Sequence, residues 1–493
     1  MAATAEIVLE MDPLLDSIKE KLKIIKIQTG EEEEPCTIYR VVPSIRGEDG
    51  AAFDPKIISI GPFHRNKKHL LPMEEIKWCY LHKLLSRVPE NTLEELLGVV
   101  RAQAPQARKM YSENLCLEPD AFVKMLLLDG CFIVEFLVRF VLEENHGQLS
   151  DTNWKMPLVR NDLLLLENQV PFFILQSLFD SSVASLFDFK NLQNDPPITL
   201  KELALSYVTQ GKLEILLESV NNVKIHHLLH LLQIALTPNP ALSGPQPFSC
   251  MNMLMQFLRK CKRFVIDLII WLLSTCLCCF AIFRRHSYLL PSKPDGSRTP
   301  RTIPSATELQ EAGIVFKERK MNQKKQNMCY LDVKFEDGIM EIPRVPIQAM
   351  TISMFHNLLA FEQCYPNSGS HFTSYAALMD NLINTPMDVA VLQDCGIIES
   401  KLGSENEVAI FFNQLCRGGY LDYENHYLVE VFKDVRKFSS SSRHRWRAML
   451  IHDYFSNPWA IISFVAAFVL LGLTIVQTVF AILSYVHPPK QPT

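Results

Sequence analysis

An apolar run near the carboxyl end constrains what this chain can fold into more than any other feature. From Ala460 to Val486, 27 residues pass without one Asp, Glu, Lys or Arg. A helix needs about 20 such residues to cross a bilayer, and at ~1.5 Å per residue this run would measure about 40 Å against a hydrocarbon core of about 30 Å. We therefore expect residues 460–486 to form a tilted transmembrane helix, followed by a short tail at residues 487–493.

Charges beside this run predict its orientation. Only one cation, Lys490, follows the run, whereas the segment before it, residues 433–459, is basic. Its cations are Lys433, Arg436, Lys437, Arg443, Arg445 and Arg447. Because cationic flanks stay on the cytosolic side, we expect a single-pass membrane protein with a cytosolic amino-terminal bulk. The basic segment either contacts anionic lipid of the bilayer or serves only to set the topology.

A second apolar run lies inside a predicted insertion at residues 237–304, between two linkers rich in proline. The run covers residues 264–283 and is interrupted by Asp267 near one end. A membrane crossing here would put the basic segment on the wrong side, so a buried helix and an interfacial segment are the favoured alternatives. Three cysteines near its end are candidates for reversible palmitoylation: Cys276, Cys278 and Cys279.

Composition narrows the class of protein. Residues 1–35 form an acidic amino-terminal segment without the features of a secretory signal. The 13 cysteines are odd in number and show no disulfide spacing, which indicates a reducing compartment. A net charge of -5 gives no global field for nucleic acid, so we expect no nucleic-acid partner.

Two blocks, residues 36–236 and residues 305–432, are predicted to form a mainly α fold. Segments such as residues 121–144 and residues 158–179 are apolar on more than one face, as buried helices are. We expect a multi-helix cytosolic domain with a small β-hairpin and the C-terminal transmembrane helix.

The hairpin is expected at residues 330–342. Apolar and charged residues alternate there, and Asp337-Gly338 supplies the turn. Just upstream, Ser305 and Glu308 fit a capping box for a short helix, which leads to a candidate third strand at residues 314–316.

Several motifs occur together in one order along the chain. They include IYRVVPSIR at residues 38–46, NDLLLLENQVPFFIL at residues 161–175 and NLLAFEQCYP at residues 357–366. Over about residues 36–485 the chain resembles the plant family known as domain of unknown function two-four-seven, a group of uncharacterised UPF0481-like single-pass membrane proteins. The resemblance implies a mainly helical membrane protein with no established enzymatic activity. It favours the plasma membrane, and an endomembrane is the alternative that the same residues allow. The part that some grass relatives play in pollen recognition favours an interaction role.

Common catalytic signatures are missing from the sequence. It contains no nucleophile elbow, zinc-protease helix, phosphate-binding loop or dinucleotide fingerprint. His226 and His230 share a helix face, but no carboxylate or thiolate pattern accompanies them, and an amphipathic helix explains them more simply. We therefore assign no catalytic residue, no cofactor and no metal.

The segment SIGPFHRNKK, residues 59–68, is a candidate contact for an anion or a lipid headgroup. Gly61-Pro62 predicts a tight turn, after which cationic side chains follow closely. These are His64, Arg65, Lys67 and Lys68. The alternative is that the same charges only solvate a loop.

A polar triplet, Glu167-Asn168-Gln169, interrupts the apolar segment just before Pro171. Pro171 ends one helix and favours the start of another, which leaves backbone groups that need partners. Short amides and a carboxylate supply such partners, and Glu362-Gln363 repeats the pattern in the second block. We interpret both as structural polar corners.

The features together predict a membrane-anchored protein-interaction module for recognition or signalling. Its expected partners are the lipid bilayer and a protein. Two alternatives remain at this stage: an enzyme that acts on a membrane-proximal substrate, and a structural membrane protein.

Overall fold

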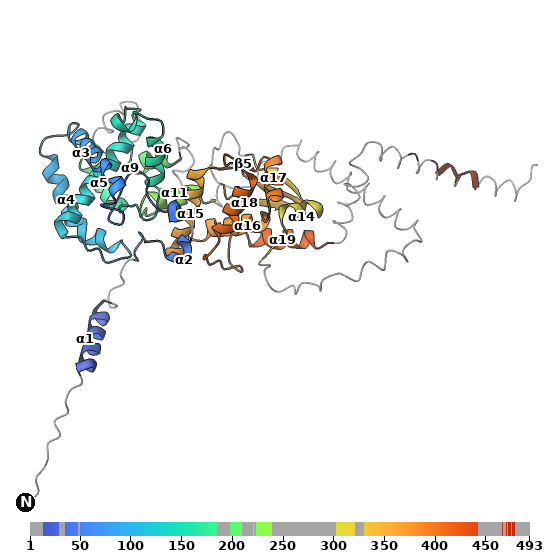
Figure 1. The fold of residues 1–493 in the computed structure, drawn as a ribbon, viewed down its shortest axis with the longest axis horizontal. Coiled ribbons are helices and arrows are strands. Elements are labelled where there is room, and N and C mark those ends of the chain that lie inside the picture. The colour runs from blue at the N-terminus through green and yellow to red at the C-terminus, as the bar shows by residue number, and fades with distance from the viewer. Residues whose placement is uncertain are drawn as a thin grey trace, which may run out of the picture. The chain divides into compact units, whose positions relative to one another are not determined.

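The computed structural model divides the chain into two units. It describes residues 13–28, 35–47, 50–184, 198–209, 220, 223–238, 302–320 and 330–441, with a few positions between 466 and 478. The first unit comprises residues 1–208 and 224–231, and the second comprises residues 209–223 and 232–493. Both consist mainly of helices (Figure 1), as the apolar segments predict.

The first unit contains helices of very different length. Its elements are α1 (Pro13–Gln28), α2 (Pro43–Arg46), η1 (Gly50–Ala52), η2 (Lys68–Leu70), α3 (Pro72–Leu85), α4 (Thr92–Lys109), α5 (Pro119–Val141), η3 (Gly147–Leu149), α6 (Lys155–Asp162), α7 (Phe172–Asp180) and α9 (Leu200–Thr209). The helix α11 (Leu228–Leu236) begins in this unit, and its residues from 232 onward belong to the second.

Helix α5 lies at the centre of the first unit. Pro119 starts it, because the fixed φ of proline suits the first turn, where no intrahelical partner is needed for its nitrogen. From Phe122 to Arg139 every residue except Lys124 is buried. Helices α3, α4 and α7 all pack against it. A helix that is apolar on all faces is stable in water only when it is covered in this way.

The second unit combines helices with two small sheets. Its elements are α14 (Ala306–Glu311), β1 (Val315–Glu318), β2 (Lys334–Glu336), β3 (Ile339–Ile342), β4 (Val345–Ile347), α15 (Ala349–Cys364), η5 (Pro366–Ser368), α16 (His371–Leu382), α17 (Pro386–Asp394), β5 (Ile398–Ser400), α18 (Glu405–Leu415) and α19 (Val429–Ser439). Helix α16 packs against both α15 and α18.

The predicted hairpin is confirmed. Strands β2 and β3 pair antiparallel, with Phe335 opposite Met340. Asp337 and Gly338 form the turn with φ of 54° and 77°, the left-handed conformation that tight hairpin turns require. The capping box of Ser305 and Glu308 is also present. The candidate third strand is β1, which pairs parallel with β3, so the sheet order is β1-β3-β2. A second sheet pairs β4 with β5 in parallel.

The prediction of a C-terminal transmembrane helix, and with it that of a single-pass membrane localisation, is wrong for the residues that the structure describes. Among them, no helix has both the length and the apolar character that a bilayer crossing requires. The longest described helix, α5, has 23 residues, but it carries charged side chains such as Asp129 and Glu135 and is covered by protein. Most of residues 460–486 lies outside the described residues, and so do residues 264–283 with Cys276, Cys278 and Cys279.

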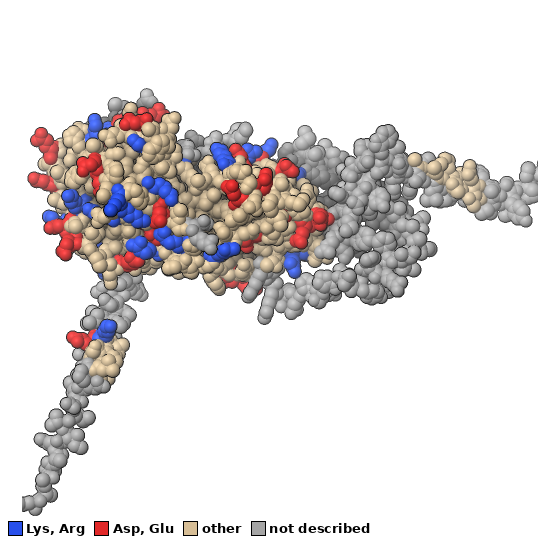
Figure 2. All heavy atoms as spheres, in the orientation of Figure 1, with Lys and Arg blue, Asp and Glu red and all other residues tan. Residues whose placement is uncertain are grey.

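Part of the predicted basic juxtamembrane segment also belongs to the second unit. Residues 433–439 lie in α19, whose Phe432 and Val435 are buried. Arg436 donates a hydrogen bond to the carbonyl of Thr302 at 3.1 Å, and Lys433 pairs with Glu430. On the face of the molecule in Figure 2, Lys and Arg are interspersed with Asp and Glu.

Candidate functional site

The polar triplet of the first unit lies in the non-helical segment between α6 and α7, and Asn168 and Gln169 are buried there. The Asn168 side chain accepts from Ile60 N at 2.7 Å and donates to the carbonyls of Ile58 and Asp162 at 3.1 and 2.9 Å. Each such bond spares a buried backbone group a desolvation penalty of about 1–3 kcal/mol. The Asn168 amide therefore ties residues 58–60 to the end of α6.

Gln169 satisfies a second set of backbone groups. Its Nε2 donates to the carbonyls of Leu163 and Leu165 at 2.8 Å each, and its Oε1 accepts from Leu228 N at 3.1 Å. The two carbonyls lie where α6 ends and would otherwise lack a helical partner, and the amide lies at the start of α11. Gln169 therefore joins two helix ends within the first unit.

Glu167 is surrounded by cationic and donor groups although its side chain is buried. Oε1 lies 2.9 Å from Arg46 and 2.8 Å from Val41 N, and Oε2 lies 3.2 Å from His64 Nε2 and 3.4 Å from Arg40. Burial raises the pKa of Glu167, but His64, Arg46 and the Val41 amide outweigh it, so the pKa is lowered overall. The carboxylate is thus held in its charged form.

The structure does not gather His64, Arg65, Lys67 and Lys68 around an open anion site. His64 is only 1% exposed; its ring nitrogens lie 3.2 Å from Glu167 and 3.8 Å from Asp54, without the alignment of a hydrogen bond. Lys67 pairs with Asp54 at 2.9 Å. Lys68 is exposed at the start of η2, and Arg65 is half-buried. Contact of these residues with an anion stays a prediction.

Gly61 brings the turn of the same segment against the polar triplet. Its φ is +70°, and a Cβ at this position would lie 2.4 Å from the carbonyl oxygen of Gln169. Gly61 N donates to Asp129 at 2.8 Å, and Asp129 pairs with the buried Lys77 at 2.6 Å. Burial raises the pKa of Asp129, and the Lys77 ammonium opposes that rise. Only glycine allows the chain to approach this closely.

In the second unit, Glu362 caps the first turn of α16. Its carboxylate accepts from the backbone amides of Phe372 at 3.0 Å and Thr373 at 2.8 Å, and from the Thr373 hydroxyl at 2.9 Å. Gln233 donates to it as well at 3.2 Å. Burial raises the pKa of Glu362, whereas the helix amides lower it. Glu362 therefore fixes where α16 begins relative to α15.

Gln363, the next residue, holds the loop that follows α18. Its Oε1 accepts from Tyr420 N at 2.6 Å, and its Nε2 donates to Tyr420 O at 3.0 Å. The amide also donates to the Thr373 hydroxyl at 3.1 Å. One side chain thus pairs with both backbone groups of Tyr420, as a neighbouring strand would.

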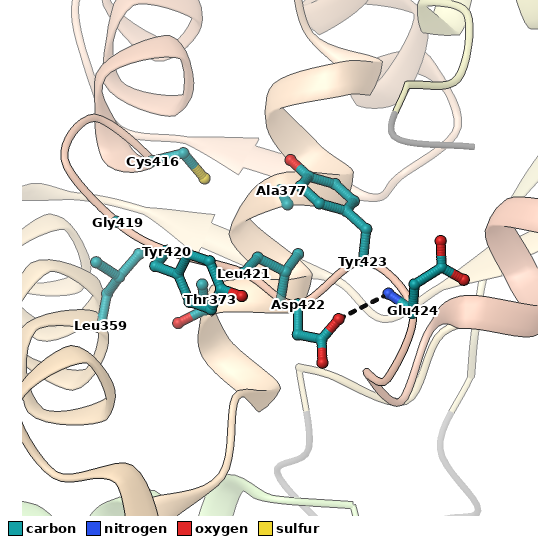
Figure 3. Close-up of a pocket in the computed structure, with 10 residues that line it drawn as sticks. All are labelled: Leu359, Thr373, Ala377, Cys416, Gly419, Tyr420, Leu421, Asp422, Tyr423 and Glu424. Carbon is teal, nitrogen blue, oxygen red and sulfur yellow. Dashed lines mark hydrogen bonds between the residues drawn. The ribbon is translucent and has the colours of Figure 1, made fainter. Parts of the chain in front are cut away.

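A pocket of about 380 Å³ lies beside this loop (Figure 3). Its walls come from α15, from α16 and from the loop after α18. It is lined by Leu359, Thr373, Ala377, Cys416, Gly419, Tyr420, Leu421, Asp422, Tyr423 and Glu424. The volume falls within the range of about 300–1,000 Å³ typical of ligand sites. We take this pocket as the candidate functional site, which no sequence motif indicated.

The cysteine of the lining is held in its protonated form. Burial, with the Asp380 carboxylate as a second cause, raises the pKa of Cys416 to about 12, so its thiol is protonated at neutral pH. The Thr373 hydroxyl donates to Glu362 and accepts from Gln363. The pocket thus offers apolar surface, two tyrosine rings and two carboxylates.

The histidines of residues 226–230 contact backbone groups. His230 Nδ1 accepts from His226 N and His227 Nδ1 accepts from His230 N, each at 3.2 Å, and His227 Nε2 lies 3.0 Å from Thr37 O. Within the described ranges, no three His, Cys, Asp or Glu side chains are grouped as a metal site requires.

Comparison with known proteins confirms the family resemblance. UPF0481 protein At3g47200 of Arabidopsis thaliana is 30% identical over 468 residues, which cover 93% of this chain and 88% of that protein. Putative UPF0481 protein At3g02645 of the same plant is 22% identical over 498 residues, which cover 90% of each. No solved structure matches. A family model described as a plant protein of unknown function matches residues 38–473, and the chain therefore belongs to the DUF247 family.

Proposed function

We propose that this protein is a protein-interaction module of a recognition or signalling type, and that its second unit contacts the partner through the pocket beside Tyr420. The observation that carries the proposal is the placement of Tyr420. Its backbone is held on both sides by Gln363, while the residue is 78% exposed. An aromatic side chain on a fixed backbone loses little conformational entropy when a partner covers it.

The chemistry of the lining supports binding. Tyrosines are enriched where proteins meet, because the ring buries apolar area and the hydroxyl keeps a polar contact. The pocket has an apolar wall, formed by Leu359, Ala377 and Leu421, against which a partner side chain can pack. Such a central, well-packed anchor commonly carries most of the affinity of an interface.

The test compares two exposed aromatic residues. Partners are captured from plant extract with the full chain, identified by mass spectrometry, purified and titrated by calorimetry. We expect Tyr420→Ala to weaken binding about 10- to 100-fold, or about 1.4–2.8 kcal/mol, as is typical of an interface anchor. Trp154→Ala, at a residue of the first unit that is 56% exposed, is the matched control and should bind like the native chain.

Thermal unfolding of both variants checks that neither has lost its fold. A purified partner that binds the native chain and Tyr420→Ala with the same Kd would contradict the proposal. A chain that binds no protein in any of these preparations would contradict it as well.

A further inference from the structure

We infer that the pocket beside Tyr420 accepts a cationic side chain of the partner, an arginine in particular. The inference rests on the proposed function and adds the chemistry of the occupant. It is carried by the composition of the lining, by the fixed position of one carboxylate and by the two tyrosine rings.

The lining is negatively charged. Asp422 and Glu424 are among its ten residues, and no Lys or Arg is. Arg417 belongs to the same loop but is not part of the lining. Among the residues that the structure describes, no ion pair joins Asp422 to a Lys, Arg or His. Burial lowers the pKa of His426 overall, although the Asp422 carboxylate raises it by a smaller amount. A cation that enters the pocket therefore meets a carboxylate that has no other ion-pair partner there.

The Asp422 carboxylate is also held in place. Its Oδ1 accepts from Glu424 N at 3.0 Å (Figure 3), the side-chain turn that aspartate forms with the backbone two residues on. Because this bond uses one oxygen, the other can receive a donor from a ligand without rearrangement of the loop. A carboxylate fixed before binding loses less entropy than a mobile surface carboxylate does.

The remaining lining suits arginine better than a small cation. A metal ion or an ammonium ion would leave most of the 380 Å³ unfilled, whereas an arginine stem can cover the apolar wall of Leu359, Ala377 and Leu421. Tyr420 and Tyr423 provide ring faces on which a planar guanidinium stacks. Lysine lacks the planar group and is more strongly hydrated, so we expect it to bind more weakly than arginine.

The test uses capped, fluorescent pentapeptides with arginine or citrulline at the centre. Citrulline has nearly the shape of arginine without its charge. The full chain is titrated with each peptide at low salt and followed by fluorescence anisotropy. We expect the arginine peptide to bind about tenfold or more tightly than the citrulline peptide, with a preference that declines as salt is added.

Asp422→Asn is the decisive variant, because asparagine keeps the acceptor for Glu424 N and removes the charge. It should abolish the preference for arginine. Asp434→Asn removes one exposed charge from α19 of the same unit and should retain the preference. Equal affinity for the two peptides, or an unchanged preference in Asp422→Asn, would overturn the inference.

The outcomes also separate this inference from the proposed function. If the two peptides bind equally while Tyr420→Ala still weakens binding of the purified partner, the inference of a cationic occupant is wrong and the proposed interaction site is right. If Tyr420→Ala leaves partner binding unchanged, both are wrong.

Discussion

Gly61→Ala tests the packing of the first unit at its closest backbone approach. The added Cβ would lie 2.4 Å from the carbonyl oxygen of Gln169, and this oxygen cannot rotate away as a side chain can. The same oxygen accepts from the Tyr111 hydroxyl at 3.2 Å. The methyl group therefore forces either Gln169 or residues 59–61 to move, and both segments are held by buried hydrogen bonds.

The magnitude follows from two contributions. Alanine in the left-handed conformation costs about 1–2 kcal/mol, and loss of the buried bond from Tyr111 costs about 1–3 kcal/mol. Their sum is about 2–5 kcal/mol, which for a unit of this size corresponds to a fall in Tm of about 4–20 °C. The lower bound is already a substantial part of the 5–15 kcal/mol that stabilises a typical domain.

The assay is thermal unfolding of the full chain, with hydrogen exchange measured by mass spectrometry to locate the effect. Gly98→Ala is the control, since a Cβ added in the middle of α4 would meet no heavy atom within 4 Å apart from the adjacent residues and the backbone of its own helix. That substitution should raise helix stability by up to about 1 kcal/mol. The reasoning is refuted if the two variants have the same Tm, or if Gly61→Ala speeds exchange only in the second unit.

Three further predictions concern buried charges and the pocket loop. Lys77→Met should lower the free energy of unfolding by about 3–5 kcal/mol in urea titrations at neutral pH, because it leaves Asp129 buried without a cation. Lys77→Met combined with Asp129→Asn should recover part of this loss. A double variant that recovers none of it would contradict the stabilising role of the ion pair. The hydrogen bonds of Asp388 outweigh burial and lower its pKa from 3.8 to about 2. The stabilisation that this carboxylate gives is therefore complete above pH 3.8 and is lost as the pH falls towards 2. The stability of Asp388→Asn should depend less on pH in that window, and parallel curves of stability against pH for the native chain and the variant would contradict this. Gln363→Ala should speed hydrogen exchange of residues 416–424 about tenfold without changing α5, and unchanged exchange there would show that Tyr420 is held by other contacts.

What could be predicted from the sequence was mostly local. The hairpin depends on an alternation and on Asp337-Gly338, which are adjacent in the chain, and the box of Ser305 and Glu308 spans four residues. Turns and helix caps of this kind are determined by residues that are adjacent in the sequence. The family motifs were likewise contiguous, so the family was predicted although its molecular activity was not.

The parts that failed or were missed depend on partners far away in the chain. The sequence places His64 among the cationic side chains of a candidate anion contact, but Glu167, more than a hundred positions later in the chain, lies beside it. The sequence does not predict the pocket, because α15, α16 and residues 416–424 form it only after packing. The transmembrane prediction relied on apolar composition, whereas no helix among the described residues has both the length and the apolar character that a bilayer crossing requires.

The two polar corners use the same side-chain types but hold different parts of the chain in place. In the first unit the amide of Asn168 binds backbone groups of the core, so its substitution should act on stability alone. In the second unit the amide of Gln363 binds both backbone groups of Tyr420, while Glu362 beside it fixes the start of α16, which supplies Thr373 to the pocket wall. The shape of the pocket is therefore set from inside the fold. It follows that Gln363, which is not among the lining residues, should control partner affinity through the position of Tyr420, whereas Asp422 should control which side chain is accepted.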